Sequence, residues 1–533
     1  MTFFKRAIPF LIMLLQVCAF AQDSVDVQIN TIIRKHGMEQ SKVMEIASWI
    51  CDVHGPRLTG SEGIFRARKW AVETLGSWGM SNVQQQAWGP FGRGWELEHF
   101  EMHAKTPQYW QVIAYPKAWS PSTKGLIKGE VVYLQASEEA DLDKYKGKLK
   151  GKFILLDSIR DTEEWFEAPA ARYTSDDLLK LANAGVPVPR PRRNWAQMGG
   201  MSFNKKLWMF LYEEQAAAIL DRGYKGDLGT VFVSGARVSN EDNVRAYDEK
   251  AQILPQATLS VEHYNRLLRL IEKGVTPEIS MEIKAEYQSP DKGMEYNVIA
   301  EIPGTDLKDE VVMFGAHFDS WHTGTGATDN GAGSAMMMEV ARILLETIKE
   351  SGIQPRRTLR LALWSGEEQG LFGSANYVRT HLAETEPGGW VPKTLKPEQS
   401  KISAYYNLDN GTGKIRGIYL QGNNEVSPIF RIWLDAFQDL DANNITLSNT
   451  GGTDHLPFDG VGVPGFQFIQ EPMAYFNRTH HSNMDNWDHL VAEDMMQAAT
   501  IVASMVWHTS QRDEKLPRKP LKMDSEKEVE GTK

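Results

Sequence analysis

Cysteine is almost absent from this chain of 533 residues, in which only Cys18 and Cys51 occur. We expect Cys18 to be removed with an N-terminal leader, so the mature chain keeps one cysteine and can form no internal disulfide. Exported eukaryotic proteins commonly carry disulfides, so their absence fits a bacterial periplasm or medium better. Packing, together with any bound metal, must hold the fold.

Long apolar runs are lacking beyond the first twenty residues. Lys5 and Arg6 precede the nearly unbroken apolar run Ala7–Cys18, and Ala19-Phe20-Ala21 supplies a small-x-small cleavage pattern. This run is too short to cross a bilayer comfortably, and no other stretch is typical of a transmembrane helix. We therefore predict a signal peptide over residues 1–21, cleavage near Ala21, and a secreted or periplasmic protein without a membrane span.

An excess of positive charge is also lacking. The predicted leader takes away two basic residues and no acidic one, which leaves 56 basic and 69 acidic side chains and a formal charge of −13. An acidic surface repels phosphate backbones, so nucleic acid is not expected as a partner. Apolar residues at 42% and charged residues at 24% are ordinary for a globular protein, and the length exceeds what one core needs.

The apolar pattern divides the mature chain into four parts. Residues 22–124 are predicted to form the first part of a catalytic domain, helical up to residue 80 and strand-like after Gly89. Residues 125–285 alternate short β-rich pieces with turns, include a predicted helix near 213–222, and are predicted to be an inserted domain. In residues 286–511, continuous apolar runs alternate with amphipathic helices, which indicates a buried, mostly parallel sheet of an α/β fold. Residues 512–533 are charged and aperiodic, and we predict a disordered tail.

Titratable side chains follow the predicted strands of the third part. His317 and Asp319 come directly after the apolar run 311–316, Glu367 and Glu368 follow the run 358–364, and Asp409 follows the run 402–408. Further donors lie in loops: Asp329 before a predicted helix, and His480 and His481 beyond the last predicted strand. Open α/β sheets bind their ligands at the carboxyl ends of the strands. We therefore expect these side chains to meet at one edge.

Carboxylates gathered in this way would repel one another unless cations compensate their charge. Imidazole mixed with carboxylate suits zinc, and two zinc ions about 3.5–4 Å apart can share a bridging carboxylate. The available donors divide between two ions, with His317 and Asp409 on one, Glu368 and His481 on the other, and Asp329 as the bridge. Glu367 is then free to act as general base, and Asp319 can orient His317.

Each motif alone has an ordinary structural explanation. A Glu-Glu pair is most often a solvated helix start placed to meet the helix dipole. Asp329-Asn330-Gly331 is by itself a turn sequence, and His480 and His481 could lie on the surface. Only the whole set in this order favours a metal centre.

Together these motifs resemble peptidase clan MH, family 28, which contains zinc aminopeptidases and carboxypeptidase Q. The resemblance rests on His317-Phe318-Asp319, Asp329-Asn330-Gly331-Ala332-Gly333, Glu367-Glu368-Gln369-Gly370, Asn407-Leu408-Asp409 and His481-Ser482-x-x-Asp485. It extends to Gly55-Pro56-Arg57-Leu58-Thr59-Gly60-Ser61 and to Gly452-Thr453-Asp454-His455-Leu456-Pro457-Phe458. It implies a phosphorylase/hydrolase-like zinc peptidase fold, in which helices flank a mixed, mostly parallel sheet.

The resemblance implies the same two zinc sites and the same base as the charge argument. The spacing from His481 to Asp485 favours His481 over His480 as the ligand. The family pattern also implies a cis peptide bond after Asp329, and the β-rich insert is similar to a protease-associated domain.

These observations predict a secreted exopeptidase that hydrolyses terminal bonds of peptides or dipeptides, with two zinc ions activating a water and Glu367 moving its proton. Aminopeptidase or dipeptidase activity is favoured, and carboxypeptidase activity is the alternative. A glutaminyl cyclase-like transferase with one zinc and a non-catalytic binding protein stay open, as does a homodimer. Tyr405 and Tyr475 are candidates for steadying an oxyanion.

Overall fold

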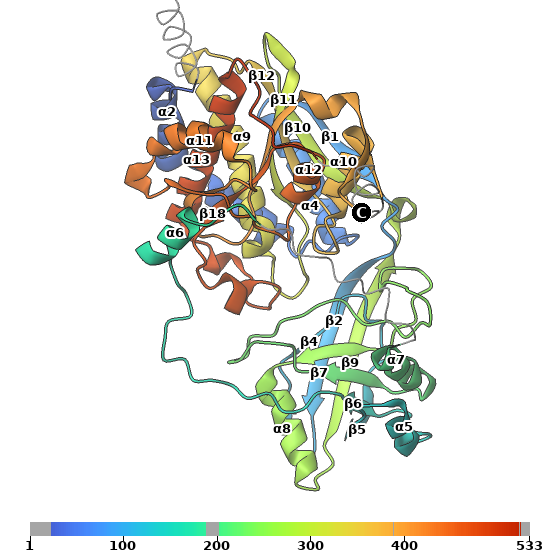
Figure 1. The fold of residues 1–533 in the computed structure, drawn as a ribbon. Helices are drawn as coiled ribbons and strands as arrows, with labels where there is room; N and C mark the ends of the chain where they lie inside the picture. Colours follow the sequence, from blue (N-terminus) through green and yellow to red (C-terminus); the bar gives the residue numbers. More distant parts are fainter. Residues whose placement is uncertain (1–22, 188–201, 387, 522, 524–533) are drawn as a thin grey trace, which may run out of the picture.

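A computed structural model describes residues 23–187, 202–386, 388–521 and 523. The predicted signal peptide lies outside the described residues. Two layered lobes, each built on an eight-stranded sheet, are joined by the long strands β2 (Gly94–Ala104) and β9 (Glu278–Gln288) (Figure 1). No helix among the described residues has the length and apolarity needed to span a membrane.

The first lobe is built on a mixed sheet in the order β1-β10-β12-β11-β15-β18-β16-β17. Its central strands β12, β11, β15 and β18 run parallel to one another. At one side β10 is antiparallel to both β12 and β1, and at the other side β16 is antiparallel to β18. The strands are β1 (Ser81–Trp88), β10 (Glu295–Ile302), β11 (Leu307–His317), β12 (Arg357–Trp364), β15 (Ile402–Asn407), β16 (Ile415–Tyr419), β17 (Asn444–Thr446) and β18 (Gly465–Gln470). This arrangement confirms the predicted α/β fold class.

Helices cover both faces of this sheet, which explains the continuous apolar runs of its strands. Val312, Phe314 and Ala316 of β11 belong to the large core beneath one set of helices, and Val311 and Met313 belong to a smaller core on the opposite face. The larger core is covered by α2 (Val27–Arg34), α3 (Val43–Ser48), α4 (Glu62–Ser77), α9 (Ala332–Ser351), α11 (Ser427–Asp435) and α13 (Ala492–Gln511). The smaller core is covered by α10 (Phe372–His381) and α12 (His455–Gly460).

The second lobe is built on the sheet β3-β2-β9-β5-β6-β7-β8-β4. Besides β2 and β9, its strands are β3 (Trp110–Gln111), β4 (Ala114–Pro116), β5 (Ile127–Tyr133), β6 (Phe153–Leu155), β7 (Ala218–Asp221) and β8 (Gln256–Leu259). Its helices are α5 (Glu139–Leu142), α7 (Phe203–Glu213) and α8 (Val261–Glu272), while α6 (Ser175–Ala182) lies beside the first lobe at β17 (Figure 1). The sheet already includes residues 94–104, so the predicted insert boundary at residue 125 lies inside this layer.

Two local predictions were wrong. The predicted helix near 213–222 is instead the end of α7 followed by β7, because residues 218–220 pair with the parallel strand β6. The predicted tail from residue 512 is packed at its start: Arg512 and Leu516 are buried, and Arg518 donates to the carbonyls of Gln399 and Ile402. A charged, aperiodic segment can be ordered when its long side chains find carbonyl partners on the folded surface.

Candidate metal centre

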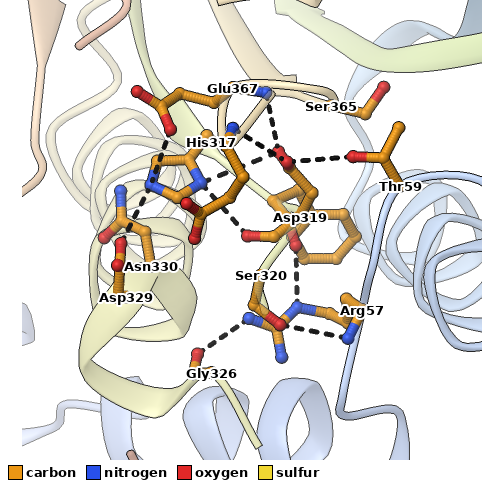
Figure 2. Close-up of polar contacts among 12 residues, drawn as sticks. Arg57, Thr59, His317, Asp319, Ser320, Gly326, Asp329, Asn330, Ser365 and Glu367 are labelled. Atoms are coloured by element: carbon orange, nitrogen blue, oxygen red, sulfur yellow. Dashed lines mark hydrogen bonds and ion pairs between the residues drawn. The ribbon is translucent and has the colours of Figure 1, made fainter. Parts of the chain in front are cut away.

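The predicted donors meet at the carboxyl ends of three neighbouring strands of the first sheet. His317 ends β11, Glu367 and Glu368 follow β12, and Asp409 follows β15. Asp329 lies in the turn Ala327–Gly331 that leads into α9, and His481 follows the turn Tyr475–Thr479. Figure 2 shows Glu367 and Asp329 converging on the imidazole of His317, with Asp319 behind it. The structure therefore brings the predicted donors together at this edge of the sheet.

Asp329 stands between two imidazoles. Its Oδ1 lies 3.3 Å from His317 Nε2, and its Oδ2 lies 3.2 Å from His481 Nε2. On the first side, Asp409 Oδ1 lies 3.6 Å from His317 Nε2. On the second side, Glu368 Oε2 lies 3.0 Å from His481 Nε2. The geometry thus groups the donors as His317, Asp329 and Asp409, and as Asp329, Glu368 and His481.

His480 also lies close to this cluster. Its Nε2 is 3.7 Å from Asp329 Oδ2, and its ring stacks on that of His481 with 3.7 Å between centroids. His481 is nearer to Asp329, and it is the imidazole that also pairs with Glu368. Both contacts support the choice of His481 as a ligand, with His480 as its stacking partner.

The donor set fits a metal ion better than it fits a protein interior without one. His317 Nε2, Asp329 Oδ2 and Glu368 Oε1 are buried and have no hydrogen-bond partner among the described residues. Buried polar atoms without partners are costly, so such atoms pointing at one another indicate a missing cation. Mixed imidazole nitrogen and carboxylate oxygen are donors that zinc accepts.

The pKa shifts have the same physical origin. Burial raises the pKa of the Glu368 carboxyl to about 7, and the nearby Asp329 carboxylate acts in the same direction. Burial by itself would lower the pKa of His481, but the carboxylates of Glu368 and Asp329 raise it to about 11. Burial also raises the pKa of Glu367 well above its usual range, and the His317 imidazole opposes that shift. Without a cation, the cluster therefore keeps protons that a metal would replace.

Asp319 contacts more of the centre than the prediction allowed, which gave it His317 as its partner. Its carboxylate accepts hydrogen bonds from the backbone N–H groups of Glu367 and Glu368, both at 3.2 Å, and from the Thr59 hydroxyl at 3.0 Å. The Asp319 main-chain carbonyl lies 3.1 Å from His317 Nδ1, closer than the carboxylate Oδ1 at 3.7 Å. Asp319 thus orients His317 mainly through its backbone and positions the Glu-Glu turn through its side chain (Figure 2).

Arg57 and Asp485 shape the loops that carry the ligands, and their roles were not predicted. The fully buried Arg57 guanidinium donates to the carbonyls of Phe318 at 2.7 Å, Thr325 at 2.8 Å and Gly326 at 2.8 Å. The Asp485 carboxylate accepts from the backbone N–H of Asp329 at 3.1 Å. Both residues lie in motifs that the family resemblance quoted, so the motif was visible in the sequence while the contact was not.

Asn330 fixes the backbone after the bridging aspartate. The Asp329–Asn330 peptide bond is cis, as the resemblance predicted. The Asn330 amide donates to the Leu408 carbonyl at 3.0 Å, and its oxygen accepts from the Gly333 N–H at 2.9 Å. The side chain thus ties the start of α9 to the segment that carries Asp409.

The two tyrosine candidates lie in different surroundings. The Tyr405 hydroxyl is buried in the core, where it donates to Asn407 Oδ1 at 2.6 Å and accepts from Trp364 Nε1 at 2.6 Å. Its hydrogen bonds are occupied, which leaves it without a role toward substrate. Tyr475 is buried near the carboxylates of Asp329 and Asp409, and burial raises the pKa of its phenol, so it stays protonated.

The second lobe touches the segment that carries His481. The Val233 N–H donates to the His481 carbonyl at 3.0 Å, and the Val231 N–H donates to Asn483 Oδ1 at 2.7 Å. An isolated bridge joins Phe232 to Ser482 between these contacts. Part of the metal centre is therefore supported from the other lobe.

Comparisons with known proteins agree with this geometry. The model of Peptidase family M28 matches residues 297–506. Carboxypeptidase Q of Mus musculus is 26% identical over 486 residues, which cover 91% of this chain and 88% of the relative. The solved structure of a Peptidase M28 precursor from Shewanella amazonensis matches with a TM-score of 0.63 at 23% sequence identity. The match covers 93% of this chain and 98% of that protein's chain. BSAP, a zinc aminopeptidase from Bacillus subtilis, matches with a TM-score of 0.53 at 18% sequence identity, and the match covers 89% of this chain and 98% of the BSAP chain.

Proposed function

We propose that this chain, which belongs to peptidase family M28 and is a metal-dependent exopeptidase of that family, holds two zinc ions. In this proposal it releases single residues from the N-terminus of peptides or splits dipeptides. The observation that carries the two-ion proposal is the position of Asp329, whose two carboxylate oxygens face two different imidazoles. One ion would be held by His317, Asp329 and Asp409, and the other by Asp329, Glu368 and His481.

Glu367 is the proposed general base and acid. When bound, zinc supplies Lewis-acid polarisation of a carbonyl and a lowered pKa for water. Glu367 Oε2 lies 3.9 Å from His317 Nε2, so its carboxylate reaches the space between the donor groups without being one of the nearest donors. Burial raises the Glu367 pKa, which suits a group that takes a proton from the attacking water and passes it to the departing amine.

The proposed direction of cleavage rests on similarity in fold to a zinc aminopeptidase, which favours a substrate whose free α-ammonium lies near the metals. Two observations favour the carboxypeptidase alternative. Carboxypeptidase Q is similar over 88% of its length, and Lys225 of the second lobe donates to the Phe476 carbonyl beside His480. A lysine there could pair with a terminal carboxylate.

The deciding experiment uses a tripeptide of three different residues in free, N-acetylated and C-amidated forms. Mass spectrometry identifies the first residue released, with and without a zinc chelator. We expect release of the N-terminal residue from the free and amidated peptides and none from the acetylated peptide or after chelation. Release from the acetylated peptide but not from the amidated one would establish the carboxypeptidase alternative.

The variant Glu367→Gln connects this activity to the centre. It keeps the size of the side chain but cannot accept a proton, so we expect kcat to fall by at least about 100-fold. Elemental analysis should show unchanged zinc. Retained activity would contradict the assignment of the base, and absence of cleavage in every peptide would favour the cyclase-like or binding alternatives. A zinc content near one per chain would contradict the two-ion proposal.

A further inference from the structure

A second group of potential metal ligands lies in the second lobe, on strands β2 and β9. His99, Glu101 and His103 alternate along β2 with Phe100 and Met102, which pack into the core of that lobe. Because side chains alternate between the faces of a strand, the two histidines and the glutamate share the face opposite the core. Glu282 of β9 pairs directly with Glu101 and belongs to the same face.

The pairing of Glu101 with Glu282 is unfavourable without a cation. Like charges directly opposite each other on antiparallel strands are destabilising. Ligand atoms of His99, Glu101 and Glu282 nevertheless all lie within 4.8 Å of one another. The side chains thus converge when repulsion alone would separate them.

His103 is oriented toward this cluster. Its Nε2 lies 3.5 Å from Glu101 Oε2, and its Nδ1 lies 3.1 Å from the Tyr109 hydroxyl. The Tyr109 ring stacks on the imidazole with 5.7 Å between centroids. Histidine ligands of metals commonly use the second ring nitrogen in such a bond, which fixes the ring and leaves the first nitrogen toward the ion.

We propose that His99, Glu101 and Glu282, with His103 as an additional donor, bind one divalent transition-metal ion, and that donor chemistry selects zinc. Imidazole and carboxylate in this ratio match zinc sites of proteins. Lys284 shares the face, and its Nζ lies 3.6 Å from Glu282 Oε1. The Lys284 side chain is 56% exposed, so it can move away when a divalent ion replaces its single charge.

The position of this site gives it a structural consequence. Strands β2 and β9 run as one ribbon from the first lobe into the second (Figure 1). At one end Trp95 belongs to a hydrophobic cluster that also includes Leu58 and Phe372 of the first lobe, and at the other end Ala104 and Ile279 lie in the core of the second lobe. An ion between Glu101 and Glu282 would cross-link the ribbon between its ends and stabilise the folded chain by mass action.

The test compares zinc content after equilibrium dialysis of the full mature protein against ZnCl2. The double variant Glu101→Gln/Glu282→Gln removes the proposed carboxylates, and Glu286→Gln is the matched control because Glu286 lies on β9 outside the cluster. We expect the double variant to hold one zinc fewer per chain than wild type and the control to hold the same number. Comparing variants makes the result independent of the number of ions at the catalytic centre.

Thermal unfolding supplies the second measurement. We expect ZnCl2 to raise Tm less in the double variant than in wild type, with hydrolysis of the tripeptide unchanged. Equal zinc content and equal Tm shifts in both proteins would overturn the proposal. Equal zinc content combined with a higher Tm of the double variant in chelator would also overturn it, because the pair would then be an uncompensated charge repulsion.

Discussion

The Asp319 side chain shows how one carboxylate can hold two segments of the chain at once. It accepts two backbone N–H groups of the turn that carries the proposed base Glu367 and the proposed zinc ligand Glu368, and it also accepts the Thr59 hydroxyl. Such charge-assisted hydrogen bonds are about twice as strong as neutral ones. Both segments depend on one residue, so its replacement should affect catalysis more than its distance from substrate suggests.

We predict that Asp319→Asn lowers kcat/KM by about 10–100-fold. The amide would turn an NH2 group toward one of the two backbone N–H donors, and the Glu367–Glu368 turn would lose one of its anchors. The measurement pairs steady-state kinetics with zinc content, and Thr59→Val serves as the control that removes one hydrogen bond of the Asp319 carboxylate and leaves both bonds to the turn. Unchanged kinetics would show that the turn holds its position without Asp319.

Zinc affinity should depend steeply on pH. The pKa of His481 is raised to about 11 and that of Glu368 to about 7 in the metal-free site, so both groups must lose protons before they bind zinc. Lowering the pH favours the protonated, metal-free form. Burial by itself would lower the pKa of the proposed ligand His317, but the carboxylates of Glu367 and Asp409 raise it well above its usual value. We therefore expect the zinc Kd to rise by at least about tenfold per pH unit as the pH falls toward 7, and more steeply below 7, measured by competition with a chelator of known affinity. A flat profile would contradict these shifts.

At the scale of elements, the loop from β11 to α9 carries the proposed bridging ligand Asp329 and contributes Phe318 and Ala327 to the large core, while most of its other residues are polar or glycine. Arg57 stabilises it from within, through carbonyls of Phe318, Thr325 and Gly326. Asp485 holds the backbone of the same loop at Asp329. Two charged side chains therefore replace the apolar packing that a helix or strand would have.

We predict that Arg57→Met lowers the free energy of unfolding of the metal-free protein by at least about 2 kcal/mol. The carbonyls of Phe318 and Thr325 would lose their donor, and each unsatisfied group costs about 1–3 kcal/mol. The Gly326 carbonyl, in contrast, keeps the Gly331 N–H as a donor. Urea denaturation in chelator measures the effect. Arg66→Met is the control, because Arg66 is an exposed arginine of α4. Equal stability of the two variants would mean that water replaces the guanidinium.

Elements were predictable from the sequence where the chain has a continuous apolar run of strand length. The runs that became β10, β11, β12, β15 and β18 are buried on both faces, so their apolar character is continuous and easily seen. Residues 218–221 form a short apolar run without a period, which fits a helix end as well as a strand. Only the neighbouring strands β6 and β8 decide that it is β7.

At the scale of the whole molecule, the second lobe supports the catalytic one. Asn483, two residues beyond the proposed ligand His481, accepts from the Val231 N–H and donates to the Gly229 carbonyl at 3.2 Å. The lobe therefore acts on the metal centre through backbone position. The sequence around either segment does not reveal this contact, because more than 250 residues separate the partners along the chain.

We predict that Asn483→Ala, which removes both side-chain hydrogen bonds to the second lobe, lowers kcat/KM by at least roughly fivefold, the equivalent of about 1 kcal/mol. The segment that carries His481 would be held less firmly, while the ligands themselves remain, so zinc content should not change. Asn240→Ala removes a comparable amide whose contacts lie within the second lobe and provides the control. An identical response of both variants would contradict a specific support of His481.

The sequence by itself determined the fold class and brought forward the candidates His317, Asp329, Glu367, Glu368, Asp409 and His481, because residues that follow continuous apolar strands must emerge at one edge of a sheet. Their division between two ions stays a proposal, although the distances to the imidazoles support it. Only the tertiary structure decided which side chains hold these ligands in place. The contacts of Arg57, Asp319 and Asn483 join segments far apart in the chain, and no local pattern of residues encodes such a distance.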